Sequence, residues 1–322
     1  MKLYPQLVET ISTLRIVDTH EHLELEEVRT SGKRDLFDLF FHHYSSTDVV
    51  SAGMPLADLA KMHDLSISME DKWKIVKPYW RLTSLTNMGR TLMRVARDVY
   101  GVDDINDKTI PELLAAFREM NKPGLYEKLI RQKGKILVCI QDSGPRIDDS
   151  RYFVNIDRLD RFIGVRCMED LKALKDYGGW DINTIDDLER AMEQYFNTAV
   201  KRPVVGIKCA LAYYQPLDFP KATKQQAETD LEQIKQTSFP PEMLPMVPHG
   251  KENRYLTNYM IRKALKLVEQ SGLPFVIHTG YLEGLGNFLS NANPEKLTPL
   301  FREFPNVRFV LYHAGYPFWR EA

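Results

Sequence analysis

The sequence predicts an α/β fold built from parallel βαβ units, on the basis of three observations. Short apolar runs of strand length alternate with stretches of helical periodicity through most of the chain. The run at 136–140 is apolar throughout, as expected for a parallel strand that is buried on both faces. Histidines and one lysine lie at the ends of several runs, where the strands of a (β/α)8 barrel present active-site residues. We therefore expect one barrel domain over residues 1–322.

The N-terminal part of the sequence predicts one strand followed by a long helical insertion. Residues 1–13 have the pattern of a short helix, and residues 14–20 have that of the first strand. The segment 24–135 is too long for a loop and lacks strand alternation, so we interpret it as helical. Helical patterns within it are present at 73–82, 92–100 and 110–114. The last of these is predicted to begin with Thr109 as N-cap and Pro111 in its first turn, where the missing N–H costs no hydrogen bond.

Strands and helices alternate through the remainder of the chain. Five further strands are predicted at 136–140, 152–156, 203–209, 274–278 and 307–313. Helices are predicted at 184–199, 222–237, 253–271 and 294–304, with a turn at 141–144 and a proline-rich loop at 239–248. Thr184 and Asp187 fit a capping box, and Gly272 fits the end of the third of these helices. This alternation is typical of a parallel sheet with crossover helices.

Composition restricts the classes of partner. The 43 basic and 44 acidic residues nearly cancel, so nothing indicates a nucleic-acid or anionic-membrane partner. Cys139, Cys167 and Cys209 form no CxxC pair, which is typical of reduced core thiols in a cytoplasmic protein. No signal peptide and no apolar run of about 18 residues is present. We expect a soluble cytoplasmic protein that acts on a small molecule, with a homo-oligomer left open.

A pair of histidines follows the first predicted strand. His20 and His22 are two residues apart, so strand alternation would direct both imidazoles to the same side. Two adjacent imidazoles can serve as metal ligands, because histidine is the commonest metal ligand in proteins. The alternative is a chance pair among the eight histidines, satisfied by ordinary hydrogen bonds.

Three more chemically active residues lie near the ends of later predicted strands. Lys208 lies near the end of the fourth strand, and His278 and His313 end the fifth and sixth. Each has a structural alternative, because a strand-end histidine is often only hydrogen-bonded and a lysine can extend to solvent. The neighbours of Lys208 would face the helix layer by alternation, which directs Lys208 into the barrel. A lysine there needs a charge partner or a metal-linked role. We expect Lys208 and all four histidines to converge in one pocket.

Four motifs together resemble the amidohydrolase superfamily in its amidohydrolase-2 branch. The likeness is to amidohydrolase domains related to nodulins and to those fused to glutamine-synthetase-like domains. It covers residues 11–23 and most of 136–322, and the insertion carries no motif of the family. The motifs are Val17-Asp18-Thr19-His20-Glu21-His22-Leu23, Val205-Gly206-Ile207-Lys208 with Ala212-Tyr213, Ile277-His278-Thr279-Gly280, and His313-Ala314-Gly315-Tyr316-Pro317-Phe318 with Arg320-Glu321-Ala322.

The resemblance implies a TIM (β/α)8 barrel with one or two divalent metal ions. It implies that His20 and His22 hold the first ion, and that His278 holds a metal or the substrate. It also implies that His313 holds a second metal or orients the attacking water. Lys208 would be a carbamylated bridge between two ions or would bind a substrate carboxylate. Zn suits the imidazole-rich ligand set, with Mn or Fe as alternatives if oxygen ligands contribute.

The predicted activity is metal-assisted hydrolysis of a C–N or C–O bond in an amide, lactone or ester. A divalent ion lowers the pKa of its water to about 7 and polarises the scissile carbonyl. The catalytic candidates are His313 and Lys208. The substrate-binding candidates are Asp142, Tyr213 and His278, with His42, His43 and Arg81 as further candidates from the insertion.

One feature of the family has no counterpart in this sequence. The resemblance implies an aspartate at the end of an eighth strand, as metal ligand and general base, yet the sequence ends nine residues after His313. We expect strands seven and eight to be absent from this chain, about 60–100 residues by the usual size of barrel repeats. Unpaired strand edges would then favour association, and turnover would be low. If the chain is active, Asp18 or Asp142 is the first candidate for the base.

Several alternatives remain open at this point. A metal-dependent decarboxylase or a uronate-isomerase-like enzyme has the same fold, and uronate isomerases also have a helical insertion soon after strand one. A PHP-type phosphoesterase also begins with an HxH pair and would hydrolyse phosphate esters. Cupins contain HxH as well, but they are all-β, which the strand–helix alternation disfavours. A non-catalytic binding protein with a relict site would purify without metal.

Overall fold

The chain divides into two compact units in the computed structural model, which describes residues 3–142, 146–239 and 254–321. Unit 1 comprises residues 1–143, 147–153 and 283–286. Unit 2 comprises residues 144–146, 154–282 and 287–322. The predicted turn at 141–144, the proline-rich loop at 239–248 and Ala322 fall wholly or partly outside the described residues.

Unit 1 begins with helix α1 (Leu3–Thr13) and strand β1 (Ile16–Glu21), close to the predicted bounds. β1 pairs in parallel with β2 (Ile136–Gln141), and the register shifts between Asp18 and Glu21. The expected burial of β2 on both faces is not observed, since Leu137 is 43% exposed. No residue of α1 is buried, so this helix does not cover the strand pair as a packed crossover helix would.

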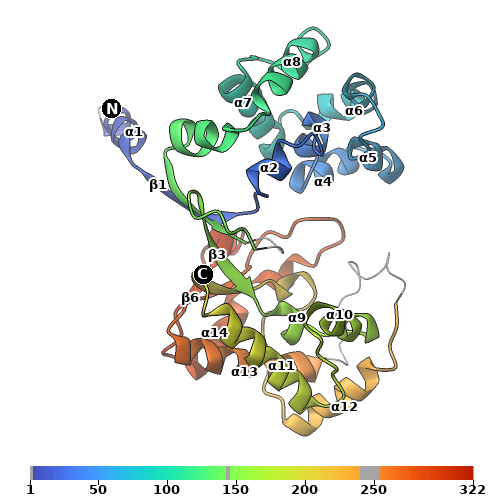
Figure 1. Ribbon diagram of the computed structural model, residues 1–322, viewed down its shortest axis with the longest axis vertical. Helices are drawn as coiled ribbons and strands as arrows, with labels where there is room; N and C mark the ends of the chain where they lie inside the picture. Colours follow the sequence, from blue (N-terminus) through green and yellow to red (C-terminus); the bar gives the residue numbers. More distant parts are fainter. Residues whose placement is uncertain (1–2, 143–145, 240–253, 322) are drawn as a thin grey trace. The chain divides into compact units, whose positions relative to one another are not determined.

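Seven α-helices and one π-helix connect β1 to β2, which confirms the predicted helical insertion. They form the group coloured blue to green in Figure 1. Their bounds are α2 (Glu26–Arg29), α3 (Leu36–Phe40), α4 (Tyr44–Ser51), α5 (Leu56–Met62), α6 (Met69–Thr83), α7 (Asn87–Tyr100), α8 (Ile110–Met120) and the π-helix η1 (Glu127–Lys133). Thr109 is the N-cap residue of α8 as predicted, but its side chain makes no capping hydrogen bond, and its hydroxyl donates to the carbonyl of Asp104, 2.7 Å away. Pro111 lies in the first turn as predicted.

Helix α6 organises the core of this helical region. It packs against α3, α4, α5, α7 and α8. Trp73 and Trp80 are seven residues apart, so they lie on one face of α6, and both are buried in this core. Lys72 is also buried, because its ammonium group is paired with Asp35 and donates to the carbonyl of Met62 at 2.8 Å. The helical region therefore has a hydrophobic core of its own.

Unit 2 contains four parallel strands: β3 (Phe153–Arg158), β4 (Val204–Cys209), β5 (Phe275–Ile277) and β6 (Phe309–Leu311). Each pairs with the next in sequence, and the register places Arg158 opposite Lys208 and Lys208 opposite Val276. Parallel strands in sequence order with helices between them are the arrangement of a (β/α) barrel. The predicted fold class is thus confirmed.

The helices of unit 2 match the prediction except in one segment. Their bounds are α9 (Asp160–Ile163), α10 (Met168–Gly178), α11 (Ile185–Ala199), α12 (Lys224–Ile234), α13 (Arg254–Ser271) and α14 (Thr298–Glu303), with 3-10 turns η2 (Leu211–Tyr213), η4 (Leu289–Ala292), η5 (Pro294–Leu297) and η6 (Tyr312–Gly315). The capping box of Thr184 and Asp187 is present at the start of α11. Gly272 follows α13 with φ of 67°, the left-handed conformation that glycine adopts most easily. Helices α9 and α10 were not predicted from the sequence.

The core of unit 2 lies between the strands and these helices. Ile207 and Cys209 of β4 belong to it, as the predicted alternation around Lys208 requires. All three cysteines of the chain are buried and form no disulfide, and burial raises the pKa of each thiol. Among the described residues, no helix has the length and apolar character needed to cross a bilayer.

Candidate metal centre and strand-end site

The pairing of β1 with β2 brings together three groups that could hold a metal ion. Glu21 lies opposite Gln141, and the N–H of Asp142 donates to the carbonyl of Glu21 at 2.8 Å. This contact places the buried carboxylate of Asp142 beside the end of β1, where its Oδ2 lies 3.3 Å from His20 Nε2. The His20 and His22 rings have centroids 4.7 Å apart, so they lie together as the strand pattern predicted. Sequence analysis had placed Asp142 only as a substrate contact or a base.

The geometry of His20, His22 and Asp142 suits a divalent cation. One ligand atom from each residue lies within 4.8 Å of the other two. Tetrahedral ligands at about 2.1 Å from an ion are about 3.4 Å apart, so the most widely spaced pair would have to close by at most about 1.4 Å. Two imidazoles and one carboxylate are also the donor set of many catalytic zinc sites, which keep a further position open. We refer to these three residues as the metal triad.

The carboxyl group of Glu21 was missed by sequence analysis, although it lies between the two histidines. Burial, and the nearby charge of Asp18, raise the pKa of Glu21 to about 7. Its Oε1 accepts the N–H of His22 at 2.7 Å, and Asp18 Oδ1 accepts the N–H of His20 at 3.1 Å. Two carboxyl groups therefore hold the backbone on which both imidazoles are mounted.

The insertion contributes further histidines to the surroundings of the metal triad. His43 stacks on His22 with ring centroids 5.6 Å apart, and His42 lies 4.6 Å from His43. Two of the three insertion candidates thus lie near the metal triad within unit 1. Arg81 lies exposed on α6, and no ion pair or ring contact joins it to these histidines among the described residues.

Unit 2 brings its two strand-end histidines into contact. The His278 and His313 rings have centroids 4.5 Å apart. His278 Nε2 lies 3.0 Å from the carbonyl of Tyr281, which can only accept, so this nitrogen carries the proton and Nδ1 is the acceptor. His313 has φ of 63° and ψ of 17°, a left-handed conformation that is uncommon for a residue other than glycine. Such conformations occur preferentially at functional sites.

The backbone around these histidines is fixed by contacts between the two strand-end motifs. The Thr279 hydroxyl donates to the carbonyl of Tyr312 at 2.7 Å in a fully buried position. Gly280 has φ of 77°, and a Cβ there would lie 2.3 Å from the carbonyl oxygen of Tyr316. Only glycine fits this close approach, which explains why a glycine follows the His–Thr pair.

Lys208 lies on β4 in a fully buried position, as predicted. Its Nζ lies 3.9 Å from the centre of the Tyr312 ring, a cation–π contact that sequence analysis missed. Tyr213, a predicted substrate contact, lies with its ring 4.7 Å from that of His278. Unit 2 thus assembles Lys208, His278, His313 and Tyr213 from three strand ends.

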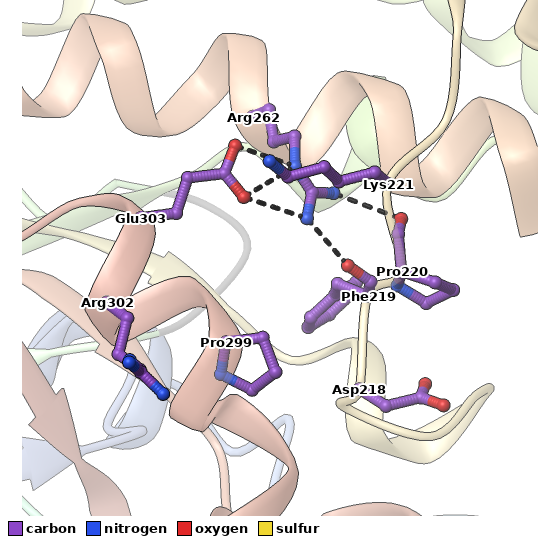
Figure 2. A pocket seen from close by; sticks show the side chains of 8 residues that line it. All are labelled: Asp218, Phe219, Pro220, Lys221, Arg262, Pro299, Arg302 and Glu303. Atoms are coloured by element: carbon purple, nitrogen blue, oxygen red, sulfur yellow. Dashed lines mark hydrogen bonds and ion pairs between the residues drawn. The ribbon is translucent and has the colours of Figure 1, made fainter.

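Convergence of Lys208 and all four histidines in one pocket stays a prediction, because His20 and His22 belong to unit 1 and the others to unit 2. Two cavities in unit 2 contain none of the predicted residues. The first, of about 430 Å³, lies between the loop at 218–221 and helix α14, with Arg262 bridging Glu303 and the carbonyl of Phe219 (Figure 2). The second, of about 320 Å³, lies beyond the end of β3 and includes Arg158, Arg161 and Arg166.

Comparison with known proteins relates the C-terminal part of the chain to a family. The amidohydrolase family model matches residues 215–322. The chain is also 30% identical over 144 residues to Protein fluG of Emericella nidulans, a match that covers 42% of this chain and 16% of fluG. The chain therefore spans only a small part of the length of that relative.

Solved structures with a similar fold cover nearly the whole chain. Uronate isomerase from Thermotoga maritima has a TM-score of 0.67 at 16% identity, over 95% of this chain and 72% of its own. Glucuronate isomerase from Caulobacter crescentus has a TM-score of 0.66 at 15% identity, over 93% and 68%. A provisionally assigned metal-dependent hydrolase from Lactobacillus casei has a TM-score of 0.61 at 15% identity, over 98% and 71%.

At these identities the structural likeness establishes the fold alone. The family match adds the segment that contains His278 and His313, and it confirms the resemblance indicated by the motifs. The amidohydrolase family model thus matches the C-terminal third of the chain, and the fold is that of the two isomerase structures.

Proposed function

We propose that the protein is a metal-dependent hydrolase that cleaves a C–N or C–O bond in a small polar substrate. The observation that carries this proposal is the metal triad, in which His20, His22 and Asp142 present ligand atoms within 4.8 Å of one another. The match of the amidohydrolase model supports the reaction class, since it covers both strand-end histidines of unit 2. A divalent ion, with Zn expected and Mn or Fe as alternatives, would supply a nucleophilic water at neutral pH and polarise the scissile carbonyl.

The chain's own residues have separable roles in this proposal. His20, His22 and Asp142 would hold the ion. Within unit 2, His313, mounted on a strained backbone next to His278, is the group to which we assign proton exchange. We assign substrate contact to His278 and Tyr213, whose rings lie together at the strand ends with centroids 4.7 Å apart. The hydrogen bond from His278 Nε2–H to the carbonyl of Tyr281 fixes the orientation of the His278 ring.

Lys208 has two roles that an experiment can separate. A buried ammonium group beside an aromatic ring is well placed to bind a carboxylate of the substrate. The resemblance of the motifs to the amidohydrolase superfamily implies instead that Lys208 is carbamylated and would bridge two ions. We expect metal content to depend on Lys208 in the second case only.

The test of the proposed function combines metal analysis with a substrate screen. The purified 322-residue chain is loaded with Zn, Mn or Fe, analysed for metal content, and assayed on amides, lactones and esters. We expect one to two ions per chain and turnover that the His20→Ala, His22→Ala double variant abolishes. Lys74→Ala, on the exposed face of α6, is the matched surface control. Full metal content in the double variant would refute the metal site.

A second candidate is isomerisation of a uronate. It is favoured by the fold match to two sugar-acid isomerases over more than nine tenths of the chain, which includes the helical insertion. The same loaded protein is therefore assayed on uronates, with the ketose product detected directly. Conversion of uronates without hydrolysis of amides, lactones or esters would replace the first proposal by this one. A metal-dependent decarboxylase would be recognised in the same screen by release of CO2.

A further inference from the structure

Unit 1 gathers five of the eight histidines of the chain into one continuous row. Two of them belong to the metal triad. The row continues from His22 to His43, from His43 to His42, and from His42 to His63, with ring centroids 5.6, 4.6 and 6.1 Å apart. The mechanism proposed above uses the first two histidines and leaves three unexplained.

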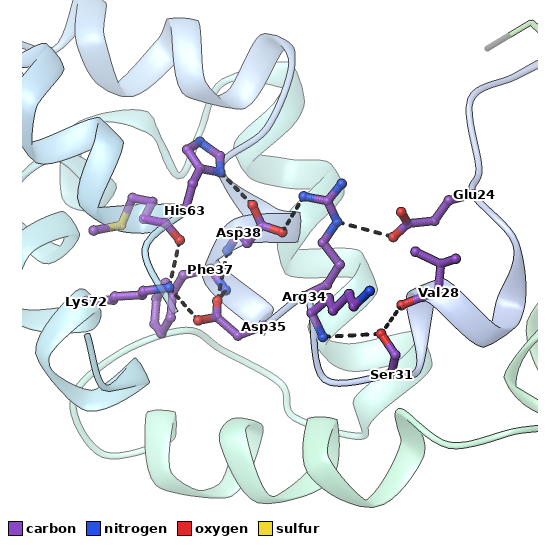
Figure 3. A network of polar contacts seen from close by, with 11 residues as sticks. Glu24, Val28, Ser31, Arg34, Asp35, Phe37, Asp38, His63 and Lys72 are labelled. Carbon is purple, nitrogen blue, oxygen red and sulfur yellow. Dashed lines mark hydrogen bonds and ion pairs between the residues drawn. The ribbon is translucent and has the colours of Figure 1, made fainter. Parts of the chain in front are cut away.

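The outer end of the row has the arrangement of a metal-binding imidazole. His63 Nδ1 lies 2.6 Å from the Oδ1 of Asp38, so the proton is on Nδ1 and Nε2 is the nitrogen able to ligate. Asp38 is itself buried and accepts from Arg34 at 3.1 Å, and Arg34 donates to Glu24 at 3.2 Å. Figure 3 shows this chain of contacts. Ligating histidines commonly donate their second N–H to a carboxylate in this way.

The inner end of the row is held by a strained backbone. His43 has φ of 52° and ψ of −135°, a combination that non-glycine residues rarely adopt. Such a conformation costs about 1–3 kcal/mol and persists where surrounding structure requires it. At His43 the result is an imidazole stacked at 28° to the ring of His22. The backbone conformation of His43 thus places its imidazole against His22, a residue of the metal triad.

The three outer histidines are open to solvent. His42, His43 and His63 are all exposed, whereas Asp142 at the inner end is fully buried. Among the described residues, they do not form a three-ligand group of their own that could hold an ion tightly. Consecutive pairs of imidazoles, by contrast, are close enough to share an ion weakly after small side-chain rotations.

From these observations we propose that His63, His42 and His43 form a transfer path along which a divalent metal ion moves between solvent and the metal triad. The path rests on the proposed function, because it needs an ion at His20, His22 and Asp142. At each step the ion would exchange one imidazole ligand for the next. No covalent bond of the protein is made or broken. The path therefore changes the rate of metal uptake and release and leaves the affinity of the metal triad unchanged.

The experiment follows metal uptake by the metal-free 322-residue protein. Co2+ is mixed rapidly with wild type and with the His42→Gln, His63→Gln double variant, and its absorption is followed to completion. We expect uptake about tenfold slower in the variant, a barrier higher by about 1.4 kcal/mol, because the ion then reaches the metal triad without intermediate imidazole ligands. Release to a chelator slows by the same factor, and the final metal content equals that of wild type.

Control variants separate this path from other causes. Lys61→Gln removes an exposed charge two residues from His63 and should load at the wild-type rate. Asp38→Asn keeps the shape of the buried side chain, loosens His63 and should slow uptake by a smaller factor. Far-UV circular dichroism and thermal unfolding confirm that each variant is folded.

The outcomes separate failure of the path from failure of the proposed function. If wild type binds Co2+ and the double variant loads as quickly, the path is refuted and the metal site stands. If the double variant ends with less bound metal, these histidines are ligands of the final site and the path is also refuted. If wild type binds no Co2+ at His20 and His22, both proposals fail together.

Discussion

The two units assemble candidate chemistry in different ways. In unit 1 the metal triad depends on one pair of parallel strands. His20 lies in β1, His22 directly follows β1, and Asp142 directly follows β2. In unit 2 the contact between His278 and His313 depends on two strand-end turns locked together through Thr279 and Gly280. The first arrangement needs only strand register, and the second needs a precise turn as well.

The comparison suggests how each group should respond to change. A ligand set built on strand ends should retain its metal when distant turns are altered, because register is fixed by hydrogen bonds along the whole strand. A pair of histidines held by a buried threonine and a crowded glycine should be lost when either contact is disturbed. We therefore expect unit 1 to control metal content and unit 2 to control turnover.

The largest effect is expected from replacing histidines of the metal triad and of the strand-end pair by alanine. His20→Ala with His22→Ala should remove metal and activity together, because the donor set loses two of its three members. His278→Ala should reduce turnover by at least about 10²-fold, as removal of a positioned catalytic or binding group does, with most of the metal retained. Elemental analysis and steady-state kinetics measure both. Equal metal loss in the two variants would contradict the expectation that unit 1 controls metal content and unit 2 controls turnover.

The second prediction concerns the buried lysine of unit 2. If Lys208 binds a substrate carboxylate, Lys208→Met should raise KM and lower kcat/KM by about 10–100-fold, the loss of one charged hydrogen bond. Metal content should then equal that of wild type. If Lys208 is carbamylated, the variant should lose at least one ion, and added bicarbonate should improve loading of wild type. Unchanged metal and unchanged kinetics would leave Lys208 a purely structural residue.

The third prediction tests the crowded turn. Gly280→Ala places a Cβ 2.3 Å from the carbonyl of Tyr316 at a φ of 77°, so backbone must shift. We expect a loss of about 2–3 kcal/mol in the free energy of unfolding, in the range of strained-backbone substitutions. Chemical denaturation of metal-free protein measures it. Gly101→Ala, also at positive φ but with open space around its Cβ, is the matched control and should cost less.

The smallest effect is expected at Asp230, away from both groups. Asp230 is buried on α12 and accepts the N–H of Leu256 at 2.9 Å, in the first turn of α13. Burial raises the pKa of the Asp230 carboxyl group above its unfolded value, because the protonated form is favoured in the fold. The stability that this protonated form contributes is full below the unfolded pKa and is lost as the pH rises through the folded pKa. The difference in free energy of unfolding between Asp230→Asn and wild type should therefore shift in favour of the variant between pH 4 and pH 7. Denaturant unfolding at the two pH values measures the difference.

A further variant separates the charge of Asp230 from its hydrogen bond. Asp230→Ala leaves the N–H of Leu256 without its acceptor and should cost about 1–3 kcal/mol at either pH. The same stability for the Asn and Ala variants would show that this hydrogen bond contributes nothing measurable.

Local features of the fold were predictable because their causes are local. The capping box of Thr184 and Asp187, the glycine after α13 and the burial of Lys208 each follow from neighbours within a few residues. Helix α10 was missed, since its N-cap residue Cys167 makes no side-chain cap hydrogen bond and is not a typical capping residue. Thr109 is the N-cap residue of α8, but its hydroxyl oxygen accepts the N–H of Asn106 at 3.1 Å and not an N–H of the helix.

By itself, the sequence determined the parallel α/β fold class, the helical insertion, and the placement of His20, His22, His278 and His313 at or next to strand ends. Only the tertiary structure decided that Asp142 lies against His20, 122 positions away in the sequence, and that three insertion histidines continue the row. The physical reason is that periodicity reports which face a side chain takes, over a few residues. Contacts between distant segments depend on strand register and on strained turns such as that of His43, and no local pattern encodes either of these.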